Sequence, residues 1–225
     1  MKKTAGIAAT FLCVFSLCVH AQQGAYTLDQ VFAKMDEVAK TFHSVQADIE
    51  RTHVTVFVND KDVSSGKFYY VKQGTQPRVR LMLTQPAETH VLIDKGKLQI
   101  YQPKLKQLQE APLGEHQDKV EMFMALGFGQ SSQDLKKNFA VSLGAEQMID
   151  GRKTSVLELK PNNSSLFTSV QLWLDQQKWV SVQIKTIEGS GDYMIAKFSN
   201  VRVNANIPES TFQLKMAPGT KIVKL

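Results

Sequence analysis

The chain has 225 residues, of which 43% are hydrophobic and 21% are charged, a composition typical of a folded globular protein and not of a disordered one. Its 27 Lys and Arg residues and 21 Asp and Glu residues give a net charge of +6, spread in small groups such as Arg78/Arg80. No segment carries a basic stripe, so binding of nucleic acid is not expected.

The first 21 residues have the pattern of a secretory signal peptide. Two lysines follow Met1, an apolar run extends over residues 5–19, and Val19 and Ala21 place small residues at the −3 and −1 positions of a cleavage site. The run is shorter than a membrane-spanning helix, and a retained N-terminal anchor is the alternative. We expect cleavage after Ala21 and a soluble mature chain that forms one domain over residues 22–225.

Both cysteines, Cys13 and Cys18, lie inside this signal, so the mature chain has no disulfide. Leucines precede both cysteines, whereas a lipid-attachment site would have a small residue there. The mature fold must therefore be stabilised by its own core or by a partner.

The first element of the mature chain is expected to be an amphipathic helix. Thr27 and Gln30 have the spacing of a capping box, which marks the start of a helix. Apolar residues then recur at the spacing of one buried helix face: Leu28, Val31, Phe32, Met35, Val38, Ala39 and Phe42.

From Ser44 onward the hydrophobic period changes to two, which is typical of β-strands. Val79, Leu81 and Leu83, for example, alternate with two arginines and a methionine, which predicts one apolar and one largely polar face. About eleven strands are expected, over residues 45–58, 66–72, 78–84, 89–94, 97–102, 105–111, 139–144, 154–160, 168–175, 179–187 and 192–203.

The turns between these strands predict an antiparallel sheet. Residues 94–96 and 150–151 read Asp-Lys-Gly and Asp-Gly, which tolerate the positive φ angles of tight hairpin tips. Connections this short exclude parallel neighbours, because parallel pairs need long crossovers. Trp173 and Trp179 flank another turn and are expected to contact each other across the strands.

One interruption of the strands is helical. Val120, Phe123, Met124 and Leu126 recur at helical spacing, and residues 133–138 can form another helical turn. A twisted sheet of about eleven strands tends to curl. The sequence therefore predicts a mainly β protein with a few α-helices, in which the helices cover part of the apolar face of a curled sheet.

Several short motifs follow one another in a specific order along the mature chain. They are "SVQADIER" (44–51), "LTQP" (83–86), an Asp-x-Gly turn (94–96), "IYQP" (100–103), "LELKP" (157–161) and "PESTFQLKMAPG" (208–219). In this order and spacing they resemble the periplasmic carriers of outer-membrane lipoproteins, the LolA-like proteins, over nearly the whole mature chain.

The resemblance implies an incomplete antiparallel barrel closed by a helical lid, in a monomeric periplasmic protein without a cofactor. Its apolar cavity would hold the acyl chains of a lipoprotein between an inner-membrane ABC transporter and an outer-membrane acceptor. The residues expected to line the cavity are Val79, Leu81, Leu83, Val91, Ile93, Leu98 and Ile100. The residues expected to form the lid are Val120, Phe123, Met124 and Leu126.

The chain departs from this family at one corner. The family's Lys-Arg-Pro motif, whose arginine is thought to tie the lid to the barrel, appears here as Lys72-Gln73-Gly74. Gln73 cannot make the same charged contact, so control of the lid either moved to another residue, with Arg78 and Arg80 as candidates, or differs from the family.

The chain offers no support for an enzyme. The four histidines after residue 21 are far apart and in no metal-ligand spacing, and no nucleophile elbow or phosphate-binding glycine loop is present. Neither a catalytic residue nor a metal site is predicted. Two other functions stay open on the same fold: a lipid- or lipoprotein-sensing regulatory protein, and a carrier of a different amphiphile.

Overall fold

The computed structural model describes residues 25–72, 77–114, 128–163 and 167–224. The expected signal peptide, the corner at Gln73 and the four expected lid residues (Val120, Phe123, Met124 and Leu126) lie outside the described residues.

In the described part of the chain, thirteen strands form one sheet. In chain order they are β1 (Ser44–Thr55), β2 (Asp60–Val71), β3 (Arg78–Gln85), β4 (Thr89–Asp94), β5 (Lys97–Gln102), β6 (Gln107–Pro112), β7 (Phe139–Leu143), β8 (Gln147–Ile149), β9 (Arg152–Pro161), β10 (Ser169–Asp175), β11 (Ser181–Ile187), β12 (Tyr193–Val203) and β13 (Lys221–Lys224). All eleven expected strands are present, and the short β8 and β13 are additional.

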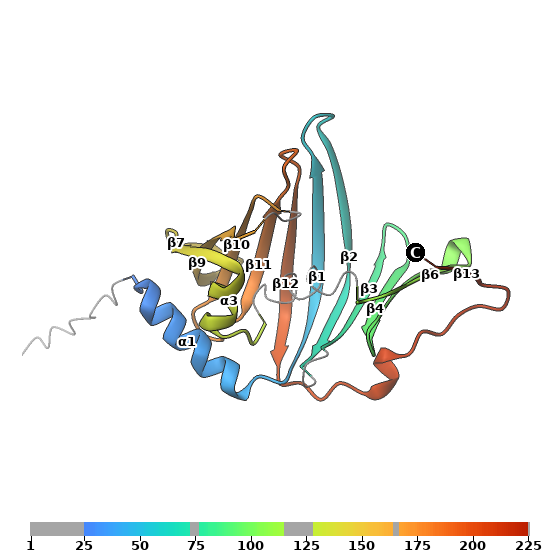
Figure 1. The fold of residues 1–225 in the computed structure, drawn as a ribbon, viewed down its shortest axis with the longest axis horizontal. Coiled ribbons are helices and arrows are strands. Elements are labelled where there is room, and N and C mark those ends of the chain that lie inside the picture. The colour runs from blue at the N-terminus through green and yellow to red at the C-terminus, as the bar shows by residue number, and fades with distance from the viewer. Residues whose placement is uncertain (1–24, 73–76, 115–127, 164–166, 225) are drawn as a thin grey trace, which may run out of the picture.

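The sheet is open, with the order β13-β6-β5-β4-β3-β2-β1-β12-β11-β10-β9-β7, and β8 pairs with β9. β1 lies near the middle because it pairs with both β2 and β12, so the strands fan out on either side of it (Figure 1). Paired neighbours are antiparallel except for β13, which adds to β6 in parallel. This confirms the prediction of an incomplete, largely antiparallel barrel.

The two predicted hairpin tips have the backbone that their sequences favour. Lys95 and Gly96 have φ angles of 50° and 71°, and Asp150 and Gly151 have φ angles of 47° and 76°. Two consecutive positive φ angles turn the chain in the sense that matches the right-handed twist of the flanking strands.

Helix α1 (Leu28–Thr41) begins with the predicted capping box of Thr27 and Gln30 and buries Val31, Phe32 and Met35. Helix α3 (Ser132–Asn138) is linked to it through Asp36, whose carboxylate accepts hydrogen bonds from the backbone N–H and the hydroxyl of Ser132 at 2.6 and 2.8 Å. Figure 1 shows both helices beside the β7–β11 half of the sheet. Among the described residues, no helix is long and apolar enough to cross a membrane.

The outer face of β3–β5 differs from the polar, solvated face that the alternation predicts. Arg80, His90 and Tyr101 lie on it and are only 4%, 9% and 2% exposed. The segment after β12, which contains the 3₁₀ helix η2 (Glu209–Phe212), returns to this face, and the backbone N–H of Ala217 donates to the Tyr101 hydroxyl at 3.0 Å. A distant segment covers these polar residues, which the alternation within one strand cannot predict.

The predicted contact between Trp173 and Trp179 is wrong. Trp173 packs with Val156 and Val182, whereas the Trp179 ring meets the Tyr26 ring edge-on, with the ring centroids 4.9 Å apart. Trp179 belongs to the turn, with a φ of 52°, and is not paired across the strands.

One surface carboxylate on the β9 side has an altered pKa. A hydrogen bond from the Lys153 ammonium, whose nitrogen lies 2.8 Å from a carboxylate oxygen of Glu146, lowers the pKa of Glu146 below its ordinary value of 4.5. A second hydrogen bond from Gln176 acts in the same direction.

Candidate functional site

The register of the sheet brings the expected cavity residues onto one face. Direct cross-strand pairs join Leu81 to both Phe68 and Val91. Two rows therefore run across the inner face from β2 to β5: Phe68–Leu81–Val91–Ile100 and Tyr70–Val79–Ile93–Leu98.

An apolar cavity of about 200 Å³ lies against these rows. Its lining residues come from β1, β2, β3, β4, β11 and β12 and from the segment before α3: Ile49, Arg51, Phe68, Tyr70, Val79, Leu81, Val91, Ile93, Phe128, Ile184, Met194, Ala196 and Phe198. The cavity is thus formed where the two halves of the sheet curl toward each other.

Four of the seven expected residues, Val79, Leu81, Val91 and Ile93, line this cavity. Leu83 points to the same side but is 7% exposed and packed in the main core. Leu98 and Ile100 continue the two rows beyond the cavity wall and stay partly exposed. Contact of any of these residues with a lipid stays a prediction.

Three aromatic rings, missed in the sequence, close one side of the cavity. Phe128 lies 5.5 Å from Phe68 and 5.0 Å from Phe198, measured between ring centroids, and is only 6% exposed. Phe128 directly follows the segment expected to form the lid, and its position between Gly127 and Gly129 is the one sequence signal that could have singled it out. Such rings attract one another in tilted and edge-on geometries.

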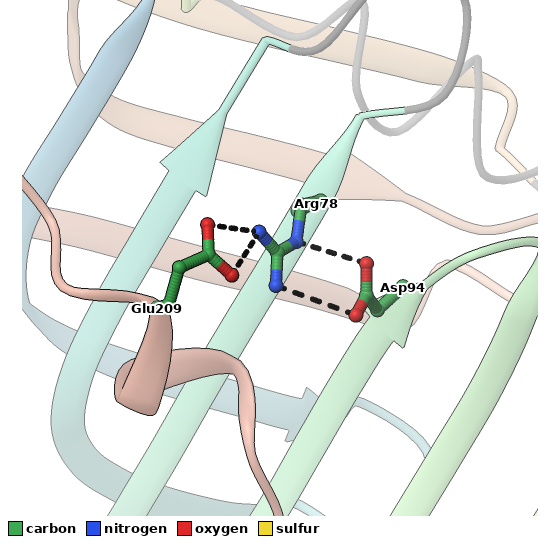
Figure 2. A network of polar contacts seen from close by, with 3 residues as sticks. All are labelled: Arg78, Asp94 and Glu209. Atoms are coloured by element: carbon green, nitrogen blue, oxygen red, sulfur yellow. Dashed lines mark hydrogen bonds and ion pairs between the residues drawn. The ribbon is translucent and has the colours of Figure 1, made fainter.

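Neither arginine proposed to replace the family's corner residue faces the cavity. Arg80 lies on the outer face, where its Nη2 is 3.0 Å from Nδ1 of His90. Arg78 lies on the same face and contacts both carboxylate oxygens of Asp94, at 2.9 Å from Nε and 3.4 Å from Nη2 (Figure 2). The strand's alternation turns both side chains away from the cavity. The expected lid lies outside the described residues, so the replacement of the family's corner arginine stays a prediction.

Arg78 instead fastens the C-terminal segment to the outer face. Figure 2 shows its guanidinium between Asp94 on β4 and Glu209 on η2, with Nη1 at 2.8 and 2.9 Å from the two Glu209 oxygens. The guanidinium carbon also lies 4.2 Å from the centroid of the Phe212 ring.

The cationic side chain that does line the cavity is Arg51, on β1 two residues after Ile49. Its Nη2 lies 3.2 Å from the Met194 sulfur. Burial among apolar groups lowers the pKa of Arg51, because it disfavours the charged form. Across the described segments, no three His, Cys, Asp or Glu side chains form a group that could hold a metal ion.

A larger depression of about 630 Å³ lies elsewhere, lined by Asp48, Glu50, Lys67, Lys197 and neighbouring residues. Charged side chains make up much of its lining, and it lacks the continuous apolar surface of the smaller cavity. The smaller cavity is therefore the better candidate site for an apolar ligand.

Comparison with known proteins agrees with this geometry. An outer-membrane lipoprotein carrier protein of Coxiella burnetii (strain RSA 331 / Henzerling II) is 22% identical over 221 residues, which are 97% of this chain and 96% of that protein. The protein MJ0687 of Methanocaldococcus jannaschii is 24% identical over 199 residues and 87% of this chain. The chain spans about half of that archaeal relative, since the match covers 53% of its length.

Two solved structures share the fold. A conserved protein of Thermus thermophilus superimposes with a TM-score of 0.55 at 11% identity, over 88% of this chain and 98% of that one. MucB superimposes with a TM-score of 0.52 at 15% identity, over 87% of this chain and 64% of its own. The model of the family described as "Outer membrane lipoprotein carrier protein LolA" matches residues 40–215, and the chain therefore belongs to the LolA family.

Proposed function

We propose that this protein is a periplasmic carrier that binds lipoprotein acyl chains in its apolar cavity and moves them from the inner toward the outer membrane. The observation that carries the proposal is the cavity itself, bounded by Val79, Leu81, Val91 and Ile93 in a chain of the LolA family. In this proposal residues 1–21 are removed on export, and residues 22–225 act as one domain. An inner-membrane ABC transporter donates the cargo, and an outer-membrane acceptor receives it.

A carrier must also release its cargo. Each buried methylene contributes about 0.8 kcal/mol, so a sixteen-carbon chain can contribute on the order of 12 kcal/mol. Binding of this strength would leave the carrier permanently loaded unless the empty cavity had its own apolar occupant. Ligand and occupant would then compete, which brings the free energies of the empty and loaded states closer together.

The Phe128 ring is suited to be part of this occupant. It is buried against Phe68 and Phe198, yet it belongs to the connection between β6 and α3 and not to the sheet. An entering acyl chain would displace this ring and take over its contacts. The expected lid residues Val120, Phe123, Met124 and Leu126 precede it in the chain, and we propose that they move with it.

Identification of the bound molecule tests this function. The protein is purified from the periplasm of its own host under conditions that keep acylated proteins soluble, and the bound species are identified by mass spectrometry. Recovery of acylated lipoproteins supports the carrier role. A different amphiphile would instead support one of the other functions, and a protein that carries nothing and fails to bind a fluorescent fatty-acid probe would contradict lipid transport.

A further inference from the structure

Arg51 is an unusual component of the cavity wall because its charge has no charged partner among the described residues. Its cross-strand neighbours, Ala196 on β12 and Ser64 on β2, are small and uncharged. The Met194 sulfur, 3.2 Å from Nη2, is a weak hydrogen-bond acceptor. Within the described part of the chain, no carboxylate pairs with the Arg51 guanidinium.

Two other arginines have stronger acceptors, whereas Arg80 also pairs with no carboxylate among the described residues but lies on the outer face, away from the cavity. Arg78 contacts two carboxylates, and Nη2 of Arg152 donates to the backbone carbonyl oxygen of Phe198 at 3.4 Å. Burial lowers the pKa of Arg51, whereas a neighbouring carboxylate would favour its charged form. A guanidinium held beside apolar groups without such an acceptor is costly for the empty protein.

The same position is favourable for one class of ligand. The guanidinium presents several N–H donors in a planar fork that matches a carboxylate or a phosphate, and such charge-assisted bonds are strong away from water. Arg51 borders the same cavity as Leu81 and Val91, so one molecule can contact the charge and the apolar wall together.

We propose that Arg51 binds the anionic group, a carboxylate or a phosphate, of an amphiphile whose apolar chain lies in the cavity. This inference rests on the proposed binding of apolar chains in the cavity and adds a second class of ligand, because the ester- and amide-linked acyl chains of a lipoprotein carry no free carboxylate or phosphate. Arg51 would then determine specificity: it would favour anionic amphiphiles over neutral ones with the same chain, while the apolar wall would bind both.

Three competitors with one chain length test the inference: dodecanoate, dodecanol and dodecyl phosphate. Each displaces a neutral fluorescent reporter, N-phenyl-1-naphthylamine, from the full mature protein, and the inhibition constants are compared. We expect dodecanoate or dodecyl phosphate to bind roughly 10- to 150-fold more tightly than dodecanol, the range of one charge-assisted hydrogen bond. A preference for the carboxylate indicates a fatty acid, and one for the phosphate indicates a phospholipid headgroup.

Variants of Arg51 test whether this residue causes the preference for anionic competitors over dodecanol. Arg51→Gln should lower the preference to nearly one because it weakens binding of both anions far more than binding of dodecanol, and Arg51→Lys should keep part of the preference because the charge remains. Arg202→Gln is the matched control: it removes the same charge from an exposed position on β12 and should keep the full preference.

The outcomes separate the two proposals. If the wild-type protein binds the reporter but shows equal constants for all three competitors, the Arg51 assignment is wrong and lipid binding stands. A preference that survives in Arg51→Gln also overturns the assignment. If neither reporter nor competitors bind the wild-type protein, the proposed function itself fails.

Discussion

Leu81 and Leu83 form a matched pair for testing whether the inner face encloses a cavity or a solid core. They are the same residue type, on the same strand and the same face, two positions apart. Leu81 lines the cavity and is partly exposed, whereas Leu83 is 7% exposed and packed in the core. We therefore expect Leu81→Asn and Leu83→Asn to differ in both stability and ligand binding.

The expected magnitudes follow from burial. Complete burial of a leucine stabilises a protein by about 1.5–3 kcal/mol, and Leu81 is only half-buried. Leu81→Asn should therefore lower the free energy of unfolding by about 1 kcal/mol, because the asparagine amide can be hydrated from the cavity. Leu83→Asn should lower the free energy of unfolding by about 2–5 kcal/mol through lost packing, as in a leucine-to-alanine change. The buried amide without hydrogen-bond partners should lower it by about 1–3 kcal/mol more. Each kcal/mol lowers the melting temperature of a chain of this size by about 2–4 °C.

Thermal unfolding followed by circular dichroism, and titration with a fluorescent fatty-acid probe, measure the two effects. Leu81→Asn should melt within about 4 °C of the wild type and bind the probe more weakly. Leu83→Asn should melt much lower. Equally large losses of stability would mean that Leu81 is ordinary core, and unchanged probe affinity in a folded Leu81→Asn would mean that the ligand binds elsewhere.

Three further predictions concern the scaffold. In urea unfolding, Asp94→Asn should cost about 2 kcal/mol because it breaks a mostly buried pair, whereas Glu209→Gln, whose carboxylate is 80% exposed, should cost under about 1 kcal/mol. Gly66→Ala should lower the melting temperature by several degrees, because its Cβ would lie 1.9 Å from a β3 carbonyl oxygen; Gly189→Ala, in open space, should not. Because the folded-state pKa of Glu146 is lowered, its contribution to stability is present above pH 4.5 and lost as the pH falls below it, and Glu146→Gln should flatten the acid side of the stability profile.

The sheet could be predicted from the sequence because its signals are local. Alternation along Val79–Leu83 and the Asp-Gly tips specify strands and hairpins without knowledge of distant contacts. Four cavity residues were assigned through the family resemblance, and their two-residue alternation is consistent with that assignment because it places them on one face, where hairpin pairing sets Leu81 beside Val91.

The parts that could not be predicted depend on contacts between distant segments. Arg51 lines the cavity because its strand β1 pairs with β12, which lies more than a hundred residues later in the chain. The covered outer face depends in the same way on the return of η2 and β13. Alternation gives the side of a strand on which a residue lies, but it does not tell which segment covers that side.

Uptake of an acylated lipoprotein from membrane vesicles tests the carrier function most directly. Inner-membrane vesicles that contain the donor transporter and a labelled lipoprotein are incubated with ATP and the mature protein, and the label is measured in the supernatant after sedimentation. A matched lipoprotein whose acylated cysteine is replaced by serine, anchored by an added transmembrane helix, is the control. The account predicts a soluble complex with the acylated lipoprotein alone, and weaker release by Leu81→Asn; no release of the acylated protein, or equal release of both, would contradict it.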